Sequence, residues 1–556
     1  MAMNRIHVTL NDGTTVEVEK GTTIYEISRI YQPKMKYNIV GAKINYEIVP
    51  MDTKITKATK IEFVDLSSTD GYKINKYGLE FVVEVALKET FGEGYEVIYD
   101  HSIANGILMR IDCEKKFTLN DAKKLKTKMN EIIASDERIY DLNVEKGEAI
   151  SYYKKVKCDE KAENIHNLTN KIVTVHKLRN YINYFYSDMP YSTGILNKYD
   201  LVYLGDNKLV LLFPSPNSKF KVPEYIHYQN VIKCFDESKK WLKTMGLPYI
   251  SDINKVVSDC KIEDLIKTIE MNYENQLHEL ASDIVKRKSK FVLIAGPSSS
   301  GKTTTTKKIA LQLRSRGYEV LVISVDNYFK NKVDSPKDAD GNYDFECLEA
   351  LDLKLLNKHL KELIAGKKVT IPEYNFVTGE KEFDNEPVKL GENAIVLMEG
   401  LHCINDAMTP DLDPELKYKV YLSPFIPLNI DRHNYISSTD LRLLRRIVRD
   451  NRTRATDVGN TINYWNTVRS GEEKHIYPYI NNIDRIVNTS LVYELGVLKV
   501  FAEPLLYSVK EDSTAYYQAR RLINNLKGFY PIPSDYVPDE SVLREFIGKS
   551  VFEHYK

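Results

Sequence analysis

The sequence predicts a multidomain protein of mixed α/β and α+β class, ending in a domain with a parallel sheet flanked by helices. Three observations support this fold class. The chain has 556 residues, which is too many for one ordinary hydrophobic core. Its first 66 residues alternate strand-like runs around one short helix. Residues 291–313 join an apolar strand through a glycine-containing loop to a helix, which is typical of a parallel α/β sheet.

Residues 1–66 predict a small domain of the β-grasp type. The stretch RIHVTLNDGTTVEVE alternates apolar and polar residues on both sides of an Asp-Gly pair, which indicates a β-hairpin. Thr22 or Thr23 is placed to cap the helix that follows, with Ile24, Ile27 and Ile30 on its apolar face. Two further strand-like stretches complete the predicted sheet: 37–45 and 59–66.

Composition disfavours several classes of protein. Lys and Arg number 78 and so do Asp and Glu, so bulk charge does not favour a protein that coats nucleic acid or anionic membrane. The six cysteines are scattered singly, which indicates neither a disulfide framework nor a zinc ribbon. No apolar run approaches the length of a membrane helix, and the N-terminus lacks a signal-peptide pattern. We expect a cytoplasmic protein without a membrane partner.

Two segments predict helices without evident chemistry. Residues 236–289 are polar and helical, with Leu265, Ile269 and Leu277 among the apolar positions, and we interpret them as a helical connector. Residues 506–556 are interpreted as a C-terminal helical tail that begins with a proline-bearing linker.

The stretch GPSSSGKTT fits the Walker A pattern G-x4-G-K-[ST], with an apolar run before it and a helical pattern after it. Glycines allow successive amides to fold around a β-phosphate, and the helix N-terminus adds a partial positive charge. Lys302 is placed to bridge the β- and γ-phosphates, and the Thr303 hydroxyl to bind Mg²⁺. We therefore expect ATP or GTP with Mg²⁺. The predicted nucleotide-binding residues of this loop are Gly296, Ser298, Ser299, Ser300, Gly301, Lys302, Thr303 and Thr304.

Two carboxylates follow apolar strands. Asp326 comes after the run at 320–323, and Glu399 ends the run at 394–398. The carboxyl ends of parallel strands form the ligand-binding edge of such a sheet. Asp326 is placed there to hold a hydroxyl for attack on the γ-phosphate, or to order a magnesium-bound water. Glu399 is the expected second magnesium ligand beside Thr303.

An arginine-rich stretch predicts a lid. Six arginines fall within thirteen residues of the helical pattern DLRLLRRIVRDNRTR. Following a Walker A loop and an acidic strand end, this stretch is suited to supply positive charge to a transferring phosphoryl group. We expect two or three of the arginines to serve this role and the rest to lie on the outer face. They are Arg442, Arg445, Arg446, Arg449, Arg452 and Arg454.

The front of the chain resembles a known pair of domains. LNDGTTVEVEKGTTIYEIS resembles the TGS domain of threonyl-tRNA synthetases, certain GTPases and stringent-response enzymes. Residues 67–235 resemble the α+β editing domain that follows it in those synthetases, with a helix at 117–133 and the turn YSTG near its end. That family's metal-binding or hydrolytic groups fall here on side chains that are neither metal ligands nor bases near neutral pH. The positions are Tyr77, Phe81, Phe185 and Met189, so the editing chemistry is expected to be lost.

Residues 290–505 resemble the uridine kinase/phosphoribulokinase family of P-loop kinases. VISVDNYFK, YDFECLEALD, IPEYNFVTGEKE and RRIVRDNRTR carry the resemblance. It implies that Asp326 is catalytic, with Lys302, Arg446 and Arg449, and that Arg454 contacts the nucleotide. It implies an acceptor site formed by Asp326, Phe329, Glu346, Tyr374, Phe376 and Arg449. The histidine that reads the base in uridine–cytidine kinases falls on Gly379, and a second lid arginine becomes Thr456. The identity of the base therefore does not transfer.

The expected function is ATP-dependent transfer of a γ-phosphate to the 5′-hydroxyl of a nucleoside, pyrimidine or purine. A phosphoribulokinase-like sugar-phosphate kinase stays an alternative, as does a regulator that senses nucleotide and binds RNA or an alarmone through its N-terminal domains. A GTPase is disfavoured, because NKYD (197–200) precedes the phosphate loop and DADG (338–341) lies in a polar run. A small-molecule effector or RNA at the N-terminal domains and a homo-oligomer are the remaining candidate partners.

Overall fold

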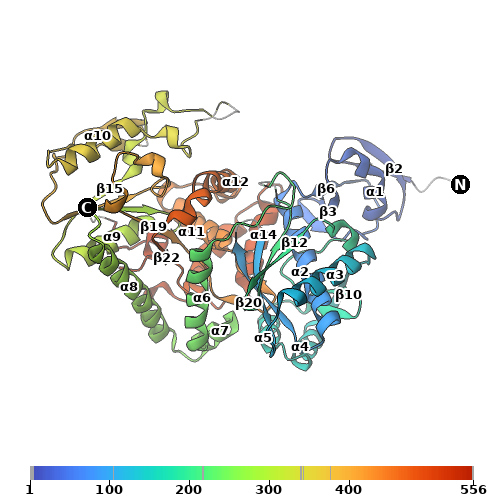
Figure 1. The fold of residues 1–556 in the computed structure, drawn as a ribbon. Coiled ribbons are helices and arrows are strands. Elements are labelled where there is room, and N and C mark those ends of the chain that lie inside the picture. Colours follow the sequence, from blue (N-terminus) through green and yellow to red (C-terminus); the bar gives the residue numbers. More distant parts are fainter. Residues whose placement is uncertain are drawn as a thin grey trace.

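The computed structural model describes residues 5–103, 106–215, 218–337, 341, 343–375 and 377–553. Figure 1 shows the small N-terminal sheets at one end of the molecule and the five-stranded parallel sheet with its helices at the other. The helices between residues 229 and 286 pass along the lower side of the view, between the two ends. The described helices include none that is both long and apolar enough to cross a bilayer.

The first domain contains two three-stranded sheets, ordered β2-β1-β5 and β4-β3-β6. The predicted hairpin is confirmed, since β1 and β2 pair antiparallel around Gly13, whose φ is +77°. Thr23 caps α1 in a capping box with Glu26. The elements are β1 (Arg5–Thr9), β2 (Thr15–Glu19), α1 (Ile24–Tyr31), β3 (Ile39–Ile44), β4 (Glu47–Val49), β5 (Thr59–Lys60) and β6 (Glu62–Asp65).

One detail of α1 differs from the prediction. Ile24 and Ile27 are fully buried, whereas Ile30 is 65% exposed. Each helical residue turns by about 100°, so Ile30 is rotated roughly 120° from Ile24, and Tyr31 returns to the buried face instead. The prediction for Ile30 is wrong for this geometric reason.

The second domain packs a long buried helix on a four-stranded antiparallel sheet, ordered β12-β13-β8-β7, with a separate sheet ordered β11-β10-β9. The predicted helix at 117–133 is α3, which Thr118 caps in a capping box with Asp121. The helices are α2 (Thr69–Phe91), α3 (Leu119–Ala134), α4 (Lys146–Lys155) and α5 (Asp159–His166). The strands are β7 (Glu96–Ile103), β8 (Gly106–Asp112), β9 (Tyr140–Glu145), β10 (Ile172–Leu178), β11 (Tyr181–Asn183), β12 (Asp200–Gly205) and β13 (Lys208–Leu212).

Three of the four positions that correspond to editing groups lie in the apolar core of this domain, and Tyr77 is partly buried against it. The rings of Tyr77 and Phe81 on α2 meet Phe185 edge to face, with centroids 5.9 and 5.6 Å apart, and Met189 belongs to the same core. Such edge-to-face aromatic pairs stabilise a core by packing. These four side chains therefore serve as packing groups here. Over the described part of the chain, no group of three or more His, Cys, Asp or Glu residues is arranged to hold a metal ion.

The C-terminal half is built on a five-stranded parallel sheet in the order β15-β18-β14-β19-β22. Both faces of its central strand are buried, as the apolar run predicts: Val292 and Ile294 enter one core, and Leu293 enters the other. The strands are β14 (Phe291–Ala295), β15 (Glu319–Ser324), β18 (Ala394–Glu399), β19 (Lys417–Ser423) and β22 (Arg485–Asn488). Two small hairpins accompany them: β16 (Glu373–Asn375) with β17 (Glu380–Glu382), and β20 (Asn429–Asp431) with β21 (Asn434–Tyr435).

Helices cover both faces of this sheet. Among the described residues they are α9 (Lys302–Arg314), α10 (Leu353–Ile364), α11 (Ser438–Arg454), α12 (Val458–His475), α13 (Glu494–Tyr507), α14 (Tyr516–Lys527) and the short α15 (Arg544–Ile547). The fold class expected from the sequence, a parallel sheet flanked by helices behind α+β domains, is confirmed.

The segment interpreted as a connector contains α6 (Gln229–Thr244), α7 (Ile250–Ser258) and α8 (Ile262–Lys286). These helices do more than join domains. Leu265, Ile269 and Leu277 of α8 are buried in the same core as Val292 and Ile294 of the central strand. The proposed boundaries after residues 235 and 505 fall inside α6 and α13, so we describe α6–α8 and α13–α15 with the sheet that they cover.

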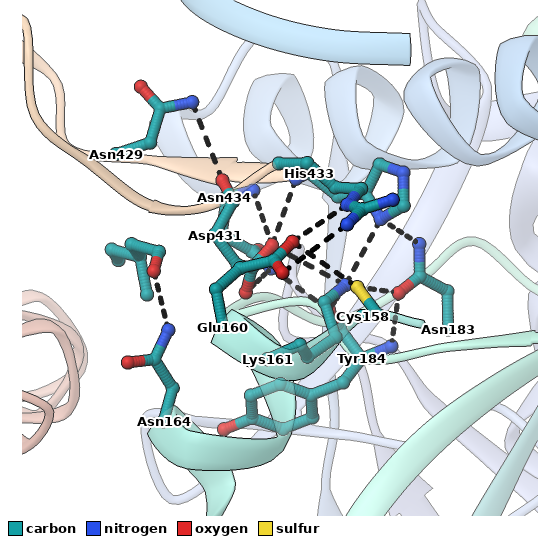
Figure 2. A network of polar contacts seen from close by, with 12 residues as sticks. Cys158, Glu160, Lys161, Asn164, Asn183, Tyr184, Asn429, Asp431, His433 and Asn434 are labelled. Carbon is teal, nitrogen blue, oxygen red and sulfur yellow. Dashed lines mark hydrogen bonds and ion pairs between the residues drawn. The ribbon is translucent and has the colours of Figure 1, made fainter. Parts of the chain in front are cut away.

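The second domain docks onto the sheet domain through the β20–β21 hairpin, as Figure 2 shows. Lys161 of α5 is fully buried and forms an ion pair with the equally buried Asp431, with the nitrogen and oxygen 3.4 Å apart. Its ammonium also donates to Asn183 and contacts Nδ1 of His433. Asn164 of the same helix donates to the carbonyl of Ile430. The hairpin leads directly into α11, so this contact lies next to the start of the arginine-rich helix.

Candidate active site at the carboxyl edge of the parallel sheet

The Walker A stretch forms a loop between β14 and α9. Gly301 precedes the helix with a φ of +84°, and a Cβ atom on Gly296 would lie 2.5 Å from the carbonyl of Leu422. Glycine is therefore required at both positions, by backbone conformation at one and by close approach at the other. The sequence thus folds here into the turn that opens the amides of α9 toward a ligand.

Polar groups of this loop are available for a ligand. Lys302 Nζ lies back over the loop and donates to the carbonyls of Gly296 and Pro297, at 2.9 and 3.3 Å. In the described part of the chain, the buried hydroxyls of Ser299 and Ser300 have no hydrogen-bond partner. Buried polar groups without partners are rare in proteins, so these hydroxyls suit an anionic ligand in the loop.

Three carboxylates surround Lys302: Asp326 after β15, Glu399 at the end of β18, and Glu346. Burial raises the pKa of each carboxyl group. The Lys302 ammonium offsets part of this rise in all three. The pKa values of Glu346 and Glu399 rise to about 7. Asp326 is nevertheless exposed, so it reaches solvent at this edge of the sheet.

Thr303 and Glu399 fit a divalent cation. Glu399 is paired in register with Ser324 on the neighbouring strand, whose hydroxyl donates to its carboxylate at 3.2 Å. The nearby Asp326 charge raises the pKa of Glu399 further. The Asp326 and Glu399 carboxylates, which repel each other, and the Thr303 hydroxyl in the first turn of α9 are hard oxygen donors, the kind that Mg²⁺ prefers.

Aromatic rings line the side of the site where the acceptor is expected. The rings of Phe329 and Tyr374 lie 5.6 Å apart, and Phe329 also meets Phe345 at 5.8 Å. The predicted residue Phe376 lies outside the described residues. Gly379 adopts a φ of +76°, and a Cβ there would lie 2.8 Å from the Cβ of Lys332. A larger side chain at this position is therefore strained, which agrees with the missing base-reading histidine.

Glu346 is held in place by groups that the sequence did not indicate. His402 contacts the Glu346 carbonyl through Nε2 at 3.0 Å, and burial lowers the pKa of His402 to about 4. The ring is thus neutral at physiological pH, and its Nε2–H donates to that carbonyl. On the other side, Gly471 of α12 leaves room for Glu346, since a Cβ there would lie 3.1 Å from the Glu346 Cβ.

The three arginines predicted for the lid share one partner. Arg446, Arg449 and Arg454 all form ion pairs with Asp450, which is 3% exposed. Arg446 also donates to the Ser298 hydroxyl at 3.1 Å, which brings it onto the phosphate loop. Within the described residues, no hydrogen bond or ion pair joins Arg449 or Arg454 to the loop, and the side chain of Arg454 is 60% exposed.

The prediction that the other arginines lie on the outer face is wrong for two of them. Arg442 and Arg445 are 2% and 0% exposed, and they form buried ion pairs with Glu472 and Glu494. The reason is that α11 packs between α12 and α13. Both guanidinium groups also donate to loop carbonyls, those of Ser298 and Ser299, at 3.1 and 3.3 Å.

Two glutamates on the phosphate loop were missed by the sequence reasoning. Glu472 of α12 accepts from the Ser298 amide at 3.1 Å while it pairs with Arg442. Glu545 of α15 accepts from the Thr304 amide at 3.1 Å, so the tail contacts the predicted nucleotide site. Neither residue belongs to a motif, and both lie far from the loop in sequence, so no local signal identifies them.

The fold and the site define a P-loop protein with a carboxylate cluster at the edge of its sheet. Residues 291–493 match the family described as the phosphoribulokinase/uridine kinase family. A uridine kinase from Macrococcus caseolyticus is 32% identical over 206 residues, covering 36% of this chain and 88% of that kinase. The chain belongs to the phosphoribulokinase/uridine kinase family, and it therefore carries a phosphotransferase domain of that kind.

Two further similarities were found. A threonine–tRNA ligase from Caldanaerobacter subterraneus is 28% identical over 246 residues, 42% of this chain, and the match spans 38% of that ligase's length. The similarity lies in the N-terminal region. A structure described as a possible uridine kinase from Bacillus stearothermophilus covers 38% of this chain and 98% of that protein, at 20% identity and a TM-score of 0.28.

Proposed function

We propose that this protein transfers the γ-phosphate of ATP to the 5′-hydroxyl of a nucleoside. The observation that supports this best is the position of Asp326, a solvent-reaching carboxylate beside Lys302 at the carboxyl edge of the sheet. The ring pair of Phe329 and Tyr374 beside it offers a surface on which a planar base can pack. The relatives named uridine kinase support the class of acceptor.

In the proposed reaction, Asp326 accepts the proton of the 5′-hydroxyl as the oxygen forms a bond to the γ-phosphorus. The bond from that phosphorus to the β,γ-bridging oxygen breaks, and ADP leaves with the electron pair. Lys302 exchanges its loop carbonyls for phosphate oxygens, and Arg446 adds positive charge from α11. Thr303 and Glu399 would hold Mg²⁺, which neutralises charge on the transferring phosphate when bound. Closure of the arginine-rich helix excludes water.

A sugar-phosphate acceptor is the second candidate. It would bring an additional negative charge close to two carboxylates. Asp326 and Glu346 already repel each other, since the Asp326 charge raises the pKa of Glu346. The unphosphorylated nucleoside therefore fits the described residues better. GTP is the second donor that we propose to test beside ATP.

The decisive experiment is a panel of nucleosides and pentose phosphates, each with ATP and with GTP, assayed for transfer of labelled γ-phosphate in Mg²⁺. We expect transfer to at least one nucleoside and none to pentose phosphates. Transfer only to a sugar phosphate would replace the nucleoside proposal. Hydrolysis without any acceptor would remove the kinase proposal.

The N-terminal half is proposed to bind an effector or RNA, or to support the kinase domain. Its first two domains enclose an open cavity of about 580 Å³ between α1 and the end of α3, next to the stacked rings of Tyr25 and Tyr191. Ligand pockets for small molecules have volumes of this order. Salt-dependent binding of tRNA would favour RNA, whereas saturable, salt-independent binding of a nucleoside or nucleotide would favour an effector.

A further inference from the structure

The C-terminal segment crosses the first turn of α9, the turn where a nucleotide's phosphates are expected. Val542 lies against the phosphate loop, since its Cγ2 is 2.5 Å from the position of a Cβ on Gly301. Leu543 and Phe546 are fully buried, and the Phe546 ring packs 4.8 Å from the guanidinium of Arg445. The segment is thus anchored in the core directly beside the loop.

The Glu545 carboxylate is hydrogen-bonded to one of the amides that we expect to bind a donor phosphate. Its Oε2 accepts a hydrogen bond from the Thr304 amide at 3.1 Å. The first amides of a helix attract anions because they lack intrahelical partners and lie at the positive end of the helix dipole. A donor phosphate would require the same amide. Glu545 therefore holds a position that a triphosphate must take over.

Two more contacts tie the end of this segment to the same region. The Lys307 ammonium donates to the carbonyl of Phe552 at 2.8 Å. Arg452, in the last turn of the arginine-rich helix, forms an ion pair with Glu553 at 2.8 Å. The same guanidinium donates to the Glu545 carbonyl at 3.4 Å. The segment thus links the phosphate helix α9 to the predicted lid α11.

We propose that residues 541–553 form an autoinhibitory segment, in which Glu545 takes the place of a donor phosphate at the Thr304 amide and must withdraw before a nucleoside triphosphate binds fully. This inference rests on the proposed function in one respect, the use of this loop for the donor. Because Leu543 and Phe546 anchor the segment, the movement is confined to the Glu545 side chain and the residues after Gly548, whose φ is +91°.

The test compares full-length Glu545→Ala with Glu540→Ala, a matched control on the same segment. Glu540 is exposed and has no hydrogen-bond or ion-pair partner among the described residues. Binding of ATP·Mg²⁺ and of inorganic tripolyphosphate is measured by titration calorimetry without acceptor. We expect E545A to lower both dissociation constants by roughly fivefold to tenfold, because a competing charge at the helix N-terminus is removed and the competent population rises. We expect E540A to stay near wild type.

Equal dissociation constants in all three proteins would overturn the proposal, and so would weaker binding by E545A, which would make Glu545 part of the nucleotide site. Failure of E545A to bind either probe would also overturn it. If E545A does not fold, Glu545→Gln keeps the side-chain volume and removes the charge, with the same expected direction. A second readout is hydrogen exchange of residues 548–553, which is expected to rise when ATP·Mg²⁺ is added. Unchanged or slower exchange there would contradict a segment that withdraws.

This outcome is independent of the acceptor assay. Tighter nucleotide binding by E545A, together with failure of the whole nucleoside panel, would keep the autoinhibitory segment and reject nucleoside phosphorylation. Nucleoside phosphorylation together with unchanged nucleotide binding by E545A would keep the proposed reaction and reject the autoinhibitory segment.

Discussion

At the scale of single residues, Asp326 has the two properties that a general base for an alcohol requires. It reaches solvent at the ligand-binding edge of the sheet, so an acceptor hydroxyl can approach it. Burial raises the pKa of Asp326, and the Lys302 ammonium beside it acts in the opposite direction. A raised pKa makes a carboxylate a stronger base, because its affinity for the hydroxyl proton is higher.

The first prediction concerns Asp326→Asn. The amide keeps the shape of the side chain but cannot accept the hydroxyl proton, so we expect kcat to fall by roughly 10²- to 10⁴-fold. The dissociation constant of ATP·Mg²⁺ should change little, which is checked by titration. Asp334→Asn, an exposed residue on the following loop, serves as the control and should retain wild-type turnover. Near-native turnover in the Asp326 variant would remove this residue from the role of base.

The second prediction concerns the pH dependence at Glu346. Its pKa rises from 4.5 to about 7, chiefly through burial and then through repulsion by Glu472. A carboxyl group with a raised pKa binds more protons in the folded than in the unfolded state, so its contribution lowers stability as pH rises from about 4.5 to 7. Thermal unfolding of wild type should show this decline, and Glu346→Gln should flatten it.

The ionised form of this carboxylate is the stronger acceptor of hydrogen bonds from sugar hydroxyls. We therefore expect KM for the nucleoside to fall as pH rises from about 6 to 8, with less change in Glu346→Gln. A KM that is independent of pH in both proteins would place Glu346 outside the acceptor site.

At the scale of elements, the phosphate loop is held from behind by α11 and α12. Arg442 donates to the Ser298 carbonyl, and Glu472 accepts from the Ser298 amide. The two side chains form a buried ion pair with a second hydrogen bond of 2.8 Å. The backbone amide and carbonyl of Ser298 are thus both held by side chains, one from α12 and one from α11.

The third prediction is that Glu472→Gln destabilises the protein by about 3 kcal/mol, because it leaves the Arg442 charge buried without a counter-charge. Chemical denaturation measures this loss. Glu473→Gln is the matched control on the next residue, where the glutamate pairs with Arg469 and is more exposed. An equal loss of unfolding free energy in E473Q and E472Q would show that the contacts of Glu472 with Arg442 and the Ser298 amide contribute nothing specific to stability.

The sequence identifies the elements whose physical signal is local. Apolar runs give β14, β15 and β18, and the glycine pattern gives the loop and the start of α9. The strand β19, KYKVYLS, is fully buried although its lysines and tyrosine polar groups interrupt the apolar pattern. The Lys417 and Lys419 ammonium groups find partners in the Thr409 carbonyl and Asp406, and these partners are invisible in the strand itself.

The candidate site also contains some residues whose positions the sequence predicts and others whose positions it does not. The positions of Lys302, Asp326 and Glu399 follow from strand ends and one loop, so the sequence predicts their neighbourhood. The burial of Arg442 and Arg445 does not follow, because an arginine pattern on a helix looks the same whether its partners are water or distant glutamates. Glu545 is the extreme case: 241 residues separate it from Thr304, and its tail carries no motif.

At the scale of the whole molecule, the N-terminal half and the kinase domain meet in a buried polar network around Lys161 and Asp431 (Figure 2). Asp431 accepts from the amides of His433 and Asn434 within its own hairpin, and it faces the Lys161 ammonium of the second domain. Burial raises the pKa of Asp431, and Lys161 lowers it again. Docking of the two domains therefore brings the Lys161 and Asp431 charges together in a site that is closed to solvent.

The fourth prediction tests this docking. Asp431→Asn keeps the hairpin's size but leaves the Lys161 ammonium buried without its counter-charge, so we expect a loss of about 3 to 5 kcal/mol in the free energy of unfolding. The double variant Lys161→Met/Asp431→Asn carries no charge at these two positions and should be more stable than Asp431→Asn, a clear departure from additivity. Lys267→Ala, at an exposed ion pair on α8, should change stability by less than about 0.5 kcal/mol.

Because the hairpin runs into α11, limited proteolysis of Asp431→Asn should cut near residues 429–437, and its kcat should fall at temperatures where the protein is still folded. Additive losses with intact kcat would mean that the two halves are joined here without influencing the arginine-rich helix.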